Sequence, residues 1–194
     1  KKQELTALAA ELPAQTMLVV DEAYIDFAQP LADYTCLQNS SFPENMVVLR
    51  TFSKMYGLAG LRIGYGVMPT WLARYLLQVK LPFSVNIIAE QAALTALEDQ
   101  GFYNATLQQV TQGRRLLSKK LSQLGCQVYP SQANFVLFKP PLPAREIFDT
   151  LLSQGIIVRT LDSYGLKDYL RVSVGNAQEN DLFLQAIERI INNG

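Results

Sequence analysis

The sequence predicts an α/β protein: part of a mostly parallel sheet, then a long helical segment, then a small α/β domain. Three observations support this fold class. Short apolar runs at residues 17–20 and 46–49 end in polar residues, as the covered strands of parallel sheets do. A helical periodicity extends over about residues 86–124. Beyond Gly125, short strand and helix patterns alternate.

The first third of the chain reads as a helix followed by strands. Leucines at helical spacing predict a helix over residues 1–12, which Pro13 ends. The strand at 17–20 is expected to be covered on both faces. The elements expected after it are a polar loop at 38–45, strands at 46–51 and 61–67, and a helix at 70–79.

The remainder of the chain reads as helices followed by a β-β-α-β-β-α unit. The long helical pattern is expected to break near residues 99–101, and Gly125 is a natural helix terminator. Asn176 is the expected N-cap of the last helix. The elements expected after Gly125 are strands at 127–129 and 135–139, a helix at 144–154, strands at 156–159 and 169–174, and a helix at 177–192.

This pattern divides the chain into three parts. We expect residues 1–83 to form a sheet domain and residues 84–124 to form a connecting helical region. Residues 125–194 are the small C-terminal domain. The first helix has no initiating Met before it and runs straight into a strand. We therefore expect the chain to be a C-terminal fragment of a longer protein.

Composition excludes several classes of function. Seventeen basic residues balance seventeen acidic ones, so nothing favours nucleic acid or an anionic membrane. There is no histidine, which excludes a Ser-His or Cys-His nucleophile and a histidine metal site within this sequence. Cys36 and Cys126 have no metal-like spacing, and no apolar stretch is long enough to span a bilayer. We expect a cytoplasmic protein with reduced thiols.

Lys54 lies in the loop that follows the strand at 46–51. A lysine there is usually a solvated cation, but its neighbours indicate another role. Thr51 and Ser53 supply hydroxyl groups, two glycines allow a tight turn, and Arg62 supplies a guanidinium. Neutral donors and a bidentate cation are what a phosphate monoester needs. A lysine beside bound phosphate can serve as a nucleophile toward an aldehyde.

Asp21 and Tyr24 follow the strand at 17–20. A carboxylate there is most often a cap or turn residue, and the tyrosine could be a packed aromatic. Alternatively, both side chains could face the ligand site, because open α/β sheets bind ligands at the carboxyl ends of their strands.

The motifs around these residues resemble those of one family. The chain reads Val-Asp-Glu-Ala-Tyr at 20–24, Leu-Arg-Thr-Phe-Ser-Lys at 49–54 and Gly-Leu-Ala-Gly-Leu-Arg at 57–62. Together they resemble the class II aminotransferases of the aspartate aminotransferase fold, and within these the histidinol-phosphate aminotransferases. Further segments that agree are 79–86, 133–135, 155–159 and 170–175. The resemblance implies that the chain is the C-terminal part of this pyridoxal-phosphate-dependent fold, with residues 1–83 as the second half of its large cofactor-binding domain.

The resemblance also implies a role for each site residue. Lys54 would form a Schiff base with pyridoxal 5′-phosphate and then move the proton of the reaction. Asp21 would pair with the ring nitrogen and Tyr24 with the ring oxygen. Residues that would bind the cofactor phosphate are Thr51, Ser53 and Arg62. Residues that would bind substrate are Asn134 and Arg171, at the α-carboxylate of glutamate, and Arg159, at a substrate phosphate.

The partners implied are small amino-acid and 2-oxo-acid substrates and a second copy of the chain, with no metal, nucleic acid or membrane. Other functions stay open on the same scaffold. The chain could belong to an aminotransferase for aromatic amino acids or to a threonine-phosphate decarboxylase. It could also be a folded fragment without catalytic activity.

Overall fold

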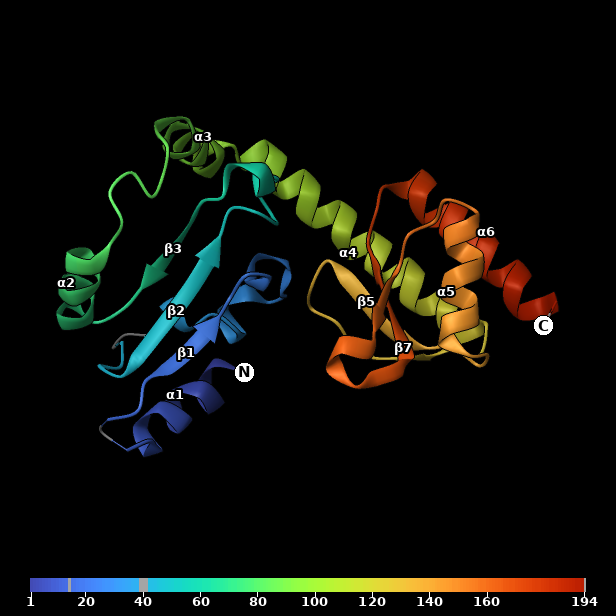
Figure 1. Ribbon diagram of the computed structural model, residues 1–194, viewed down its shortest axis with the longest axis horizontal. Helices are drawn as coiled ribbons and strands as arrows, with labels where there is room; N and C mark the ends of the chain where they lie inside the picture. The colour runs from blue at the N-terminus through green and yellow to red at the C-terminus, as the bar shows by residue number, and fades with distance from the viewer. Residues whose placement is uncertain (14, 39–41, 194) are drawn as a thin grey trace. The chain divides into compact units, whose positions relative to one another are not determined.

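The computed structural model describes residues 1–13, 15–38 and 42–193. The chain forms two compact units, Lys1–Thr106 and Leu107–Gly194. Both belong to the α/β class that the sequence predicts (Figure 1). Of the loop expected at residues 38–45, residues 39–41 lie outside the described part of the chain.

The first unit is built on a three-stranded sheet of order β1-β2-β3 (Figure 1). Strands β1 (Leu18–Asp21) and β2 (Met46–Thr51) are parallel, and β3 (Gly64–Val67) is antiparallel to β2. No α-helix intervenes between β2 and β3, and β3 returns beside β2 in the opposite direction. The helices of this unit are α1 (Lys2–Glu11), α2 (Thr70–Val79) and α3 (Ile87–Glu98).

One face of this sheet packs on α1. Ala9 of α1, Cys36, Met46 and Val48 form a buried cluster there, with Leu18 and Val20 beside them. The opposite face is open in this chain, because Val19 is 57% exposed and Leu49 is 40% exposed. The apolar sequence of β1 predicted that both of its faces would be covered. The described residues cover only the face that packs on α1.

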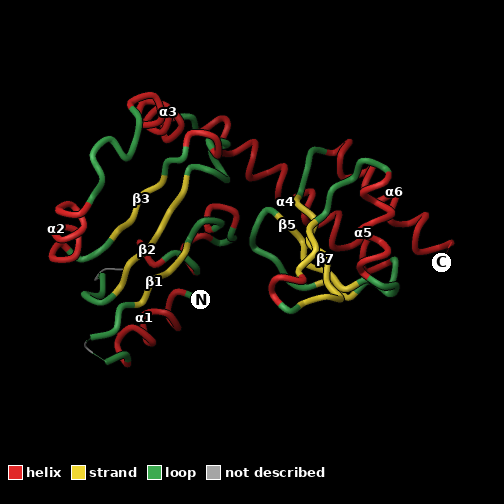
Figure 2. Tube along the Cα trace, in the orientation of Figure 1, coloured by secondary structure: helices red, strands yellow, loops and turns green. Residues whose placement is uncertain are grey.

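Helices α3 and α4 (Gln100–Gln123) meet where the sequence predicted a break. Asp99 ends α3, and its Oδ1 accepts a hydrogen bond from the Phe102 backbone N–H at 2.9 Å. This is the N-cap arrangement that satisfies a free backbone donor of α4. Helix α4 begins in the first unit and continues into the second (Figure 2).

The second unit has an antiparallel sheet of order β4-β5-β7-β6. Its strands are β4 (Gln127–Val128), β5 (Phe135–Lys139), β6 (Arg159–Leu161) and β7 (Leu166–Ser173), and its helices besides α4 are α5 (Ala144–Ser153) and α6 (Ala177–Asn193). Asn176 caps α6, as expected, through a 2.9 Å bond from the Glu179 N–H, and the Glu179 side chain accepts from Asn176 N–H at 2.8 Å.

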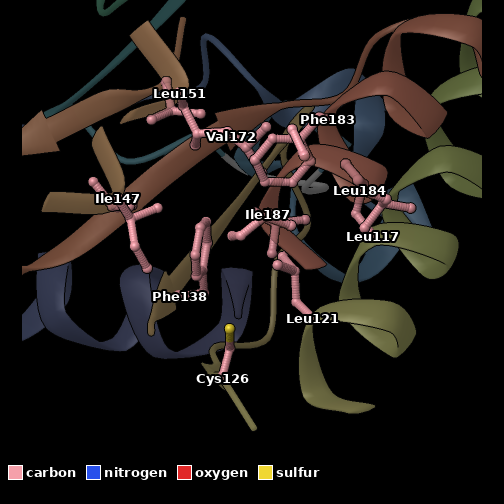
Figure 3. Packing of buried hydrophobic residues seen from close by; sticks show 14 of the residues in the cluster. Leu117, Leu121, Cys126, Phe138, Ile147, Leu151, Val172, Phe183, Leu184 and Ile187 are labelled. Atoms are coloured by element: carbon pink, nitrogen blue, oxygen red, sulfur yellow. The ribbon is translucent and has the colours of Figure 1, made fainter. Parts of the chain in front are cut away.

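The core of the second unit lies between its sheet and these helices (Figure 3). Leu117 and Leu121 of α4, Phe138 of β5 and Ile187 of α6 are fully buried in it. Each such side chain contributes roughly 1.5–3 kcal/mol to folding. The other face of the sheet carries Arg159 and Arg171 instead.

Three strands predicted from the sequence have wrong bounds. The strand expected at residues 169–174 already begins at Leu166. The strand expected at residues 61–67 begins only at Gly64, because Ala59–Leu61 form a 3-10 turn and Arg62 has a left-handed backbone with φ of 53°. The strand expected at 156–159 lies at Arg159–Leu161, the residues whose partners are on β7. An apolar run identifies a buried segment, but ladder pairing decides where the strand lies.

Gly113 of α4 provides a test of packing in the second unit. A Cβ atom there would lie 2.5 Å from Val174 Cγ1 and 2.9 Å from Asn180 Nδ2. We expect Gly113→Ala to lower the free energy of unfolding by about 1–3 kcal/mol, as overpacking does. Gly101→Ala on the same helix is the control, because its Cβ would meet only Asp99 Oδ1 at 3.4 Å. Urea unfolding measures both, and equal stabilities would contradict this packing.

Candidate active site

Two strand ends meet at one edge of the first sheet. Asp21 is the last residue of β1, and Thr51 is the last residue of the parallel neighbour β2. Asp21 is in register with Leu49, two residues before Thr51, so both side chains lie on the same face of the sheet. That face is the open one, and the Asp21 side chain is exposed on it. Asp21 Oδ1 accepts a 2.9 Å hydrogen bond from Ala23 N–H.

Lys54 and Tyr24 come together from the loops after these strands. The Lys54 Nζ atom lies 5.3 Å from the centroid of the Tyr24 ring, within the range of a cation–π contact. Lys54 is exposed and Tyr24 is half-buried. An amine therefore stands at the sheet edge that also carries Asp21.

Hydroxyl and guanidinium donors lie next to the lysine. Arg62 Nη1 is 3.4 Å from Ser53 Oγ and donates to the Ala59 carbonyl at 2.8 Å. The Thr51 hydroxyl accepts from Ser53 N–H at 3.0 Å. The positive φ of Arg62 is strained for a residue with a side chain, and such strain concentrates at functional sites. The group suits an anion with several oxygens.

A buried charge network lies directly behind these residues. The Arg50 guanidinium donates to Glu22 Oε2 at 2.8 Å, to Asp26 Oδ1 at 3.2 Å and to Thr35 Oγ1 at 2.9 Å. The second oxygen of Glu22 accepts from Cys36 N–H at 2.7 Å. The Arg50 side chain is 11% exposed and that of Glu22 only 2%. The network joins the ends of β1 and β2 to the segment between them.

Tyr103, at the start of α4, extends this network. Its hydroxyl is hydrogen-bonded to Asp26, and its ring lies 5.9 Å from that of Tyr56. Burial, with the Asp26 charge beside it, raises the pKa of Tyr103 to about 12. Burial also raises the pKa of Asp26, although Arg50 opposes the shift.

The predicted substrate residues lie in the second unit. Arg159 and Arg171 are directly opposite each other on β6 and β7, an arrangement that repels like charges. The Arg171 guanidinium lies 4.7 Å from the Phe135 ring centroid, and its buried Nε has no hydrogen-bond partner among the described residues. Asn134 precedes β5, and its carbonyl accepts from Val174 N–H at 2.9 Å. The paired cations favour an anionic ligand.

The sequence as a whole decides the family. A family model described as aminotransferase class I and II matches residues 1–187. The chain belongs to this family. The resemblance read from the motifs is thereby confirmed.

Individual relatives agree with this assignment. A histidinol-phosphate aminotransferase from Nitratidesulfovibrio vulgaris is 51% identical over 188 residues, covering 97% of this chain and 50% of the relative. The histidinol-phosphate aminotransferase of Sinorhizobium meliloti, solved with pyridoxal-5′-phosphate, has a TM-score of 0.90 at 31% identity, covering 99% of this chain and 53% of that one. The predicted fold class is confirmed. The chain spans about half the length of the curated relatives it matches.

A solved decarboxylase is also similar. The L-threonine-O-3-phosphate decarboxylase of Porphyromonas gingivalis has a TM-score of 0.82 at 26% identity, covering 99% of this chain and 60% of that one. The fold is therefore shared by enzymes that are named for different reactions.

The first unit gathers the residues predicted to bind the cofactor, namely Asp21, Tyr24, Thr51, Ser53, Lys54 and Arg62. The residues predicted to bind substrate are all in the second unit. Their roles stay predictions. No cluster of metal-ligating side chains occurs in the described ranges. Within those ranges, no helix has the length and apolar character needed to cross a membrane.

Sequence reasoning missed Glu22, Asp26, Arg50 and Tyr103. Glu22 and Arg50 stand inside the motifs at 20–24 and 49–54, yet no role was predicted for them. One signal was available: Arg50 is a charged residue within an otherwise apolar strand pattern, directly before Thr51. Such a residue needs a buried partner of opposite charge.

Tyr103 gives a test of the charge network by titration. In the native protein it should ionise near pH 12 rather than near 10. Its raised pKa stabilises the fold below about pH 10, and this contribution is lost as the pH rises toward 12. The measurement is tyrosinate absorbance against pH for the wild type minus Tyr103→Phe. A difference curve centred near 10 while the protein stays folded would contradict the buried contact with Asp26.

Proposed function

We propose that this chain carries the lysine-bearing part of a pyridoxal-phosphate-dependent aminotransferase, with histidinol phosphate and 2-oxoglutarate as its substrate pair. The observation that carries the proposal is the Lys54 amine held over Tyr24 at the sheet edge that also bears Asp21. The names of the relatives supply the choice of substrate.

The side chains at this edge fit the cofactor. Ser53 and Arg62 are already within 3.4 Å of each other, as two donors to one phosphate would be. Asp21 presents a carboxylate on the open face of the sheet, where a protonated ring nitrogen could be paired. The Tyr24 hydroxyl is the nearby donor for the ring oxygen. Lys54 is the amine that would hold the aldehyde.

Pyridoxal phosphate, when bound, supplies an electron sink that stabilises negative charge at the substrate Cα. The remaining work belongs to the protein. Lys54 Nζ takes and returns the proton that moves at that carbon, because it is the amine of the site. Asp21 keeps the ring nitrogen protonated, and the Ser53–Arg62 pair anchors the phosphate. Tyr24 orients the ring and the amine toward each other.

The substrate would be bound by the arginines of the second unit. Arg171 would bind the α-carboxylate of glutamate together with Asn134, and Arg159 would bind the phosphate of histidinol phosphate. The cross-strand pairing of the two arginines and the unpartnered Arg171 Nε support an anionic substrate. If each arginine served only in a surface ion pair with a carboxylate, that pair would stabilise the fold by about 1 kcal/mol or less. So small a gain gives little reason for two arginines to lie opposite each other.

A decarboxylase acting on threonine phosphate is the second candidate. The same arginines suit it, because threonine phosphate carries a carboxylate for Arg171 and a phosphate for Arg159. The similarity to the Porphyromonas gingivalis enzyme favours keeping this candidate. The relatives at 45–51% identity, all named histidinol-phosphate aminotransferases, favour the transaminase.

We also propose that the protein acts as a cytoplasmic homodimer. The support is a set of exposed apolar side chains on α2, on α3 and on the segment between them. Its most exposed members, 69–100% exposed, are Leu77, Val79, Leu81, Phe83, Ile87 and Ile88. An exposed apolar patch of this kind marks an interaction site. Sedimentation velocity distinguishes a dimer from a monomer.

Lys54→Ala tests the cofactor assignment. Wild-type chain mixed with pyridoxal phosphate should gain the visible absorbance band of a protein-bound imine, and Lys54→Ala should lack it because it has no amine at that position. The matched control is Lys119→Ala, an exposed lysine of α4 in the second unit. An unchanged band in Lys54→Ala, with circular dichroism showing retained folding, would refute the assignment.

Steady-state assays separate the candidate reactions. Histidinol phosphate, phenylalanine and threonine phosphate are each offered with 2-oxoglutarate, and glutamate and carbon dioxide are both measured. We expect glutamate with the first substrate, at kcat/KM about 100-fold or more above that for phenylalanine, because Arg159 would have no phosphate to bind in phenylalanine. Carbon dioxide from threonine phosphate without glutamate would establish the decarboxylase instead.

A further inference from the structure

Each of the three nitrogen atoms of the Arg50 guanidinium donates a hydrogen bond within the buried network. Three donors of one guanidinium reach three different acceptors, on Glu22, Asp26 and Thr35. The Thr35 hydroxyl is also 2.9 Å from Glu22 Oε2, and Cys36 N–H occupies Glu22 Oε1. A planar guanidinium with this many partners fixes the positions of all of them at once.

Net stability does not explain this arrangement. Arg50, Glu22 and Asp26 have side chains only 2–11% exposed, so three charges have been removed from water. Buried ion groups of this kind are often no more stabilising than apolar side chains of similar volume. What they add is a defined geometry, which is valuable where neighbouring residues must be placed accurately.

The neighbours of the network are the proposed cofactor residues. Glu22 lies between Asp21 and Tyr24, and its carbonyl accepts from Ile25 N–H at 3.1 Å in the turn that carries Tyr24. Arg50 directly precedes Thr51, in the strand that leads to Lys54. The Glu22–Arg50 ion pair therefore joins the two chain segments whose side chains meet at 5.3 Å.

We infer that Glu22 and Arg50 are positioning residues, whose buried ion pair holds the Tyr24 ring against the Lys54 amine. The significance of this contact for catalysis rests on the proposed function, whereas the contact itself does not. Neither side chain is placed to touch the cofactor. They act by fixing the distance between the ends of β1 and β2.

The decisive variant replaces the network by apolar side chains. Glu22→Leu, Asp26→Leu and Arg50→Met are combined, and Val48→Ala is the control that destabilises the same unit through its core. The readout is the nuclear Overhauser effect (NOE) between the Tyr24 ring and the Lys54 ε-methylene protons, without cofactor. We expect it in the wild type and in Val48→Ala. We expect its loss in the triple variant, with a thermal midpoint no lower than that of Val48→Ala.

A folded triple variant that keeps the NOE would overturn the inference, because the network would then serve only folding. Arg50→Lys covers the case in which the triple variant does not fold. Lysine keeps the charge but cannot reach three acceptors in fixed directions, so the NOE should fall about twofold or more. An undiminished NOE in Arg50→Lys would also overturn the inference.

Cofactor affinity gives a second readout. The dissociation constant for pyridoxal phosphate, from absorbance titration, should rise about 10-fold in Arg50→Lys, as when a residue that orients direct ligands is changed. It should stay unchanged in Val48→Ala, and an equal rise in both variants would contradict a positioning role. If the wild type binds no cofactor, the proposed function fails, and the NOE still decides the positioning role.

Discussion

The buried guanidinium of Arg50 is the constraint on which the candidate site depends. It lies near the end of β2 and donates hydrogen bonds to Glu22, which directly follows β1, and to Asp26 and Thr35, farther along the segment between the two strands. Parallel pairing aligns the two strands but leaves the chain beyond them free. The guanidinium extends the alignment past the sheet, into the segments that carry Tyr24 and Lys54. An ion pair largely shielded from water thus determines where the exposed Lys54 and the half-buried Tyr24 side chains lie.

The open face of the sheet suits this arrangement. Asp21 and Thr51 project from it, while the face that packs on α1 holds the apolar cluster. The residues that stabilise the fold and the candidate site residues therefore lie on opposite faces of the same strands. The alternation of side chains along a strand makes the separation possible, because a register shift of one residue would exchange the two sides. The register between Asp21 and Leu49 is thus a functional feature as well as a structural one.

Most helices and strands could be predicted from the sequence, because apolar periodicity reports which segments are buried. The break at Asp99 and the cap at Asn176 were also readable, since a short polar side chain at a helix start has a specific local role. The limits of β3 and β6 were not, because they depend on pairing with distant strands. The left-handed backbone of Arg62 is unusual for an arginine, and no local pattern signals it.

The sequence allowed candidate residues for the site to be named, but it did not reveal the buried charge network that lies behind them. Lys54, Asp21 and Arg62 could be named as candidates because their residue types and the motifs around them are informative. Glu22 and Asp26 were not, because a carboxylate after a strand looks solvated until its partner is known. The arginine pair on β6 and β7 illustrates the same point from the other side. Adjacent cations weaken a sheet unless an anion joins them. The Arg50 network and the arginine pair can be recognised only once the strand pairing is known. A charged side chain without a partner then indicates a ligand site, and one with several partners indicates a residue that positions its neighbours.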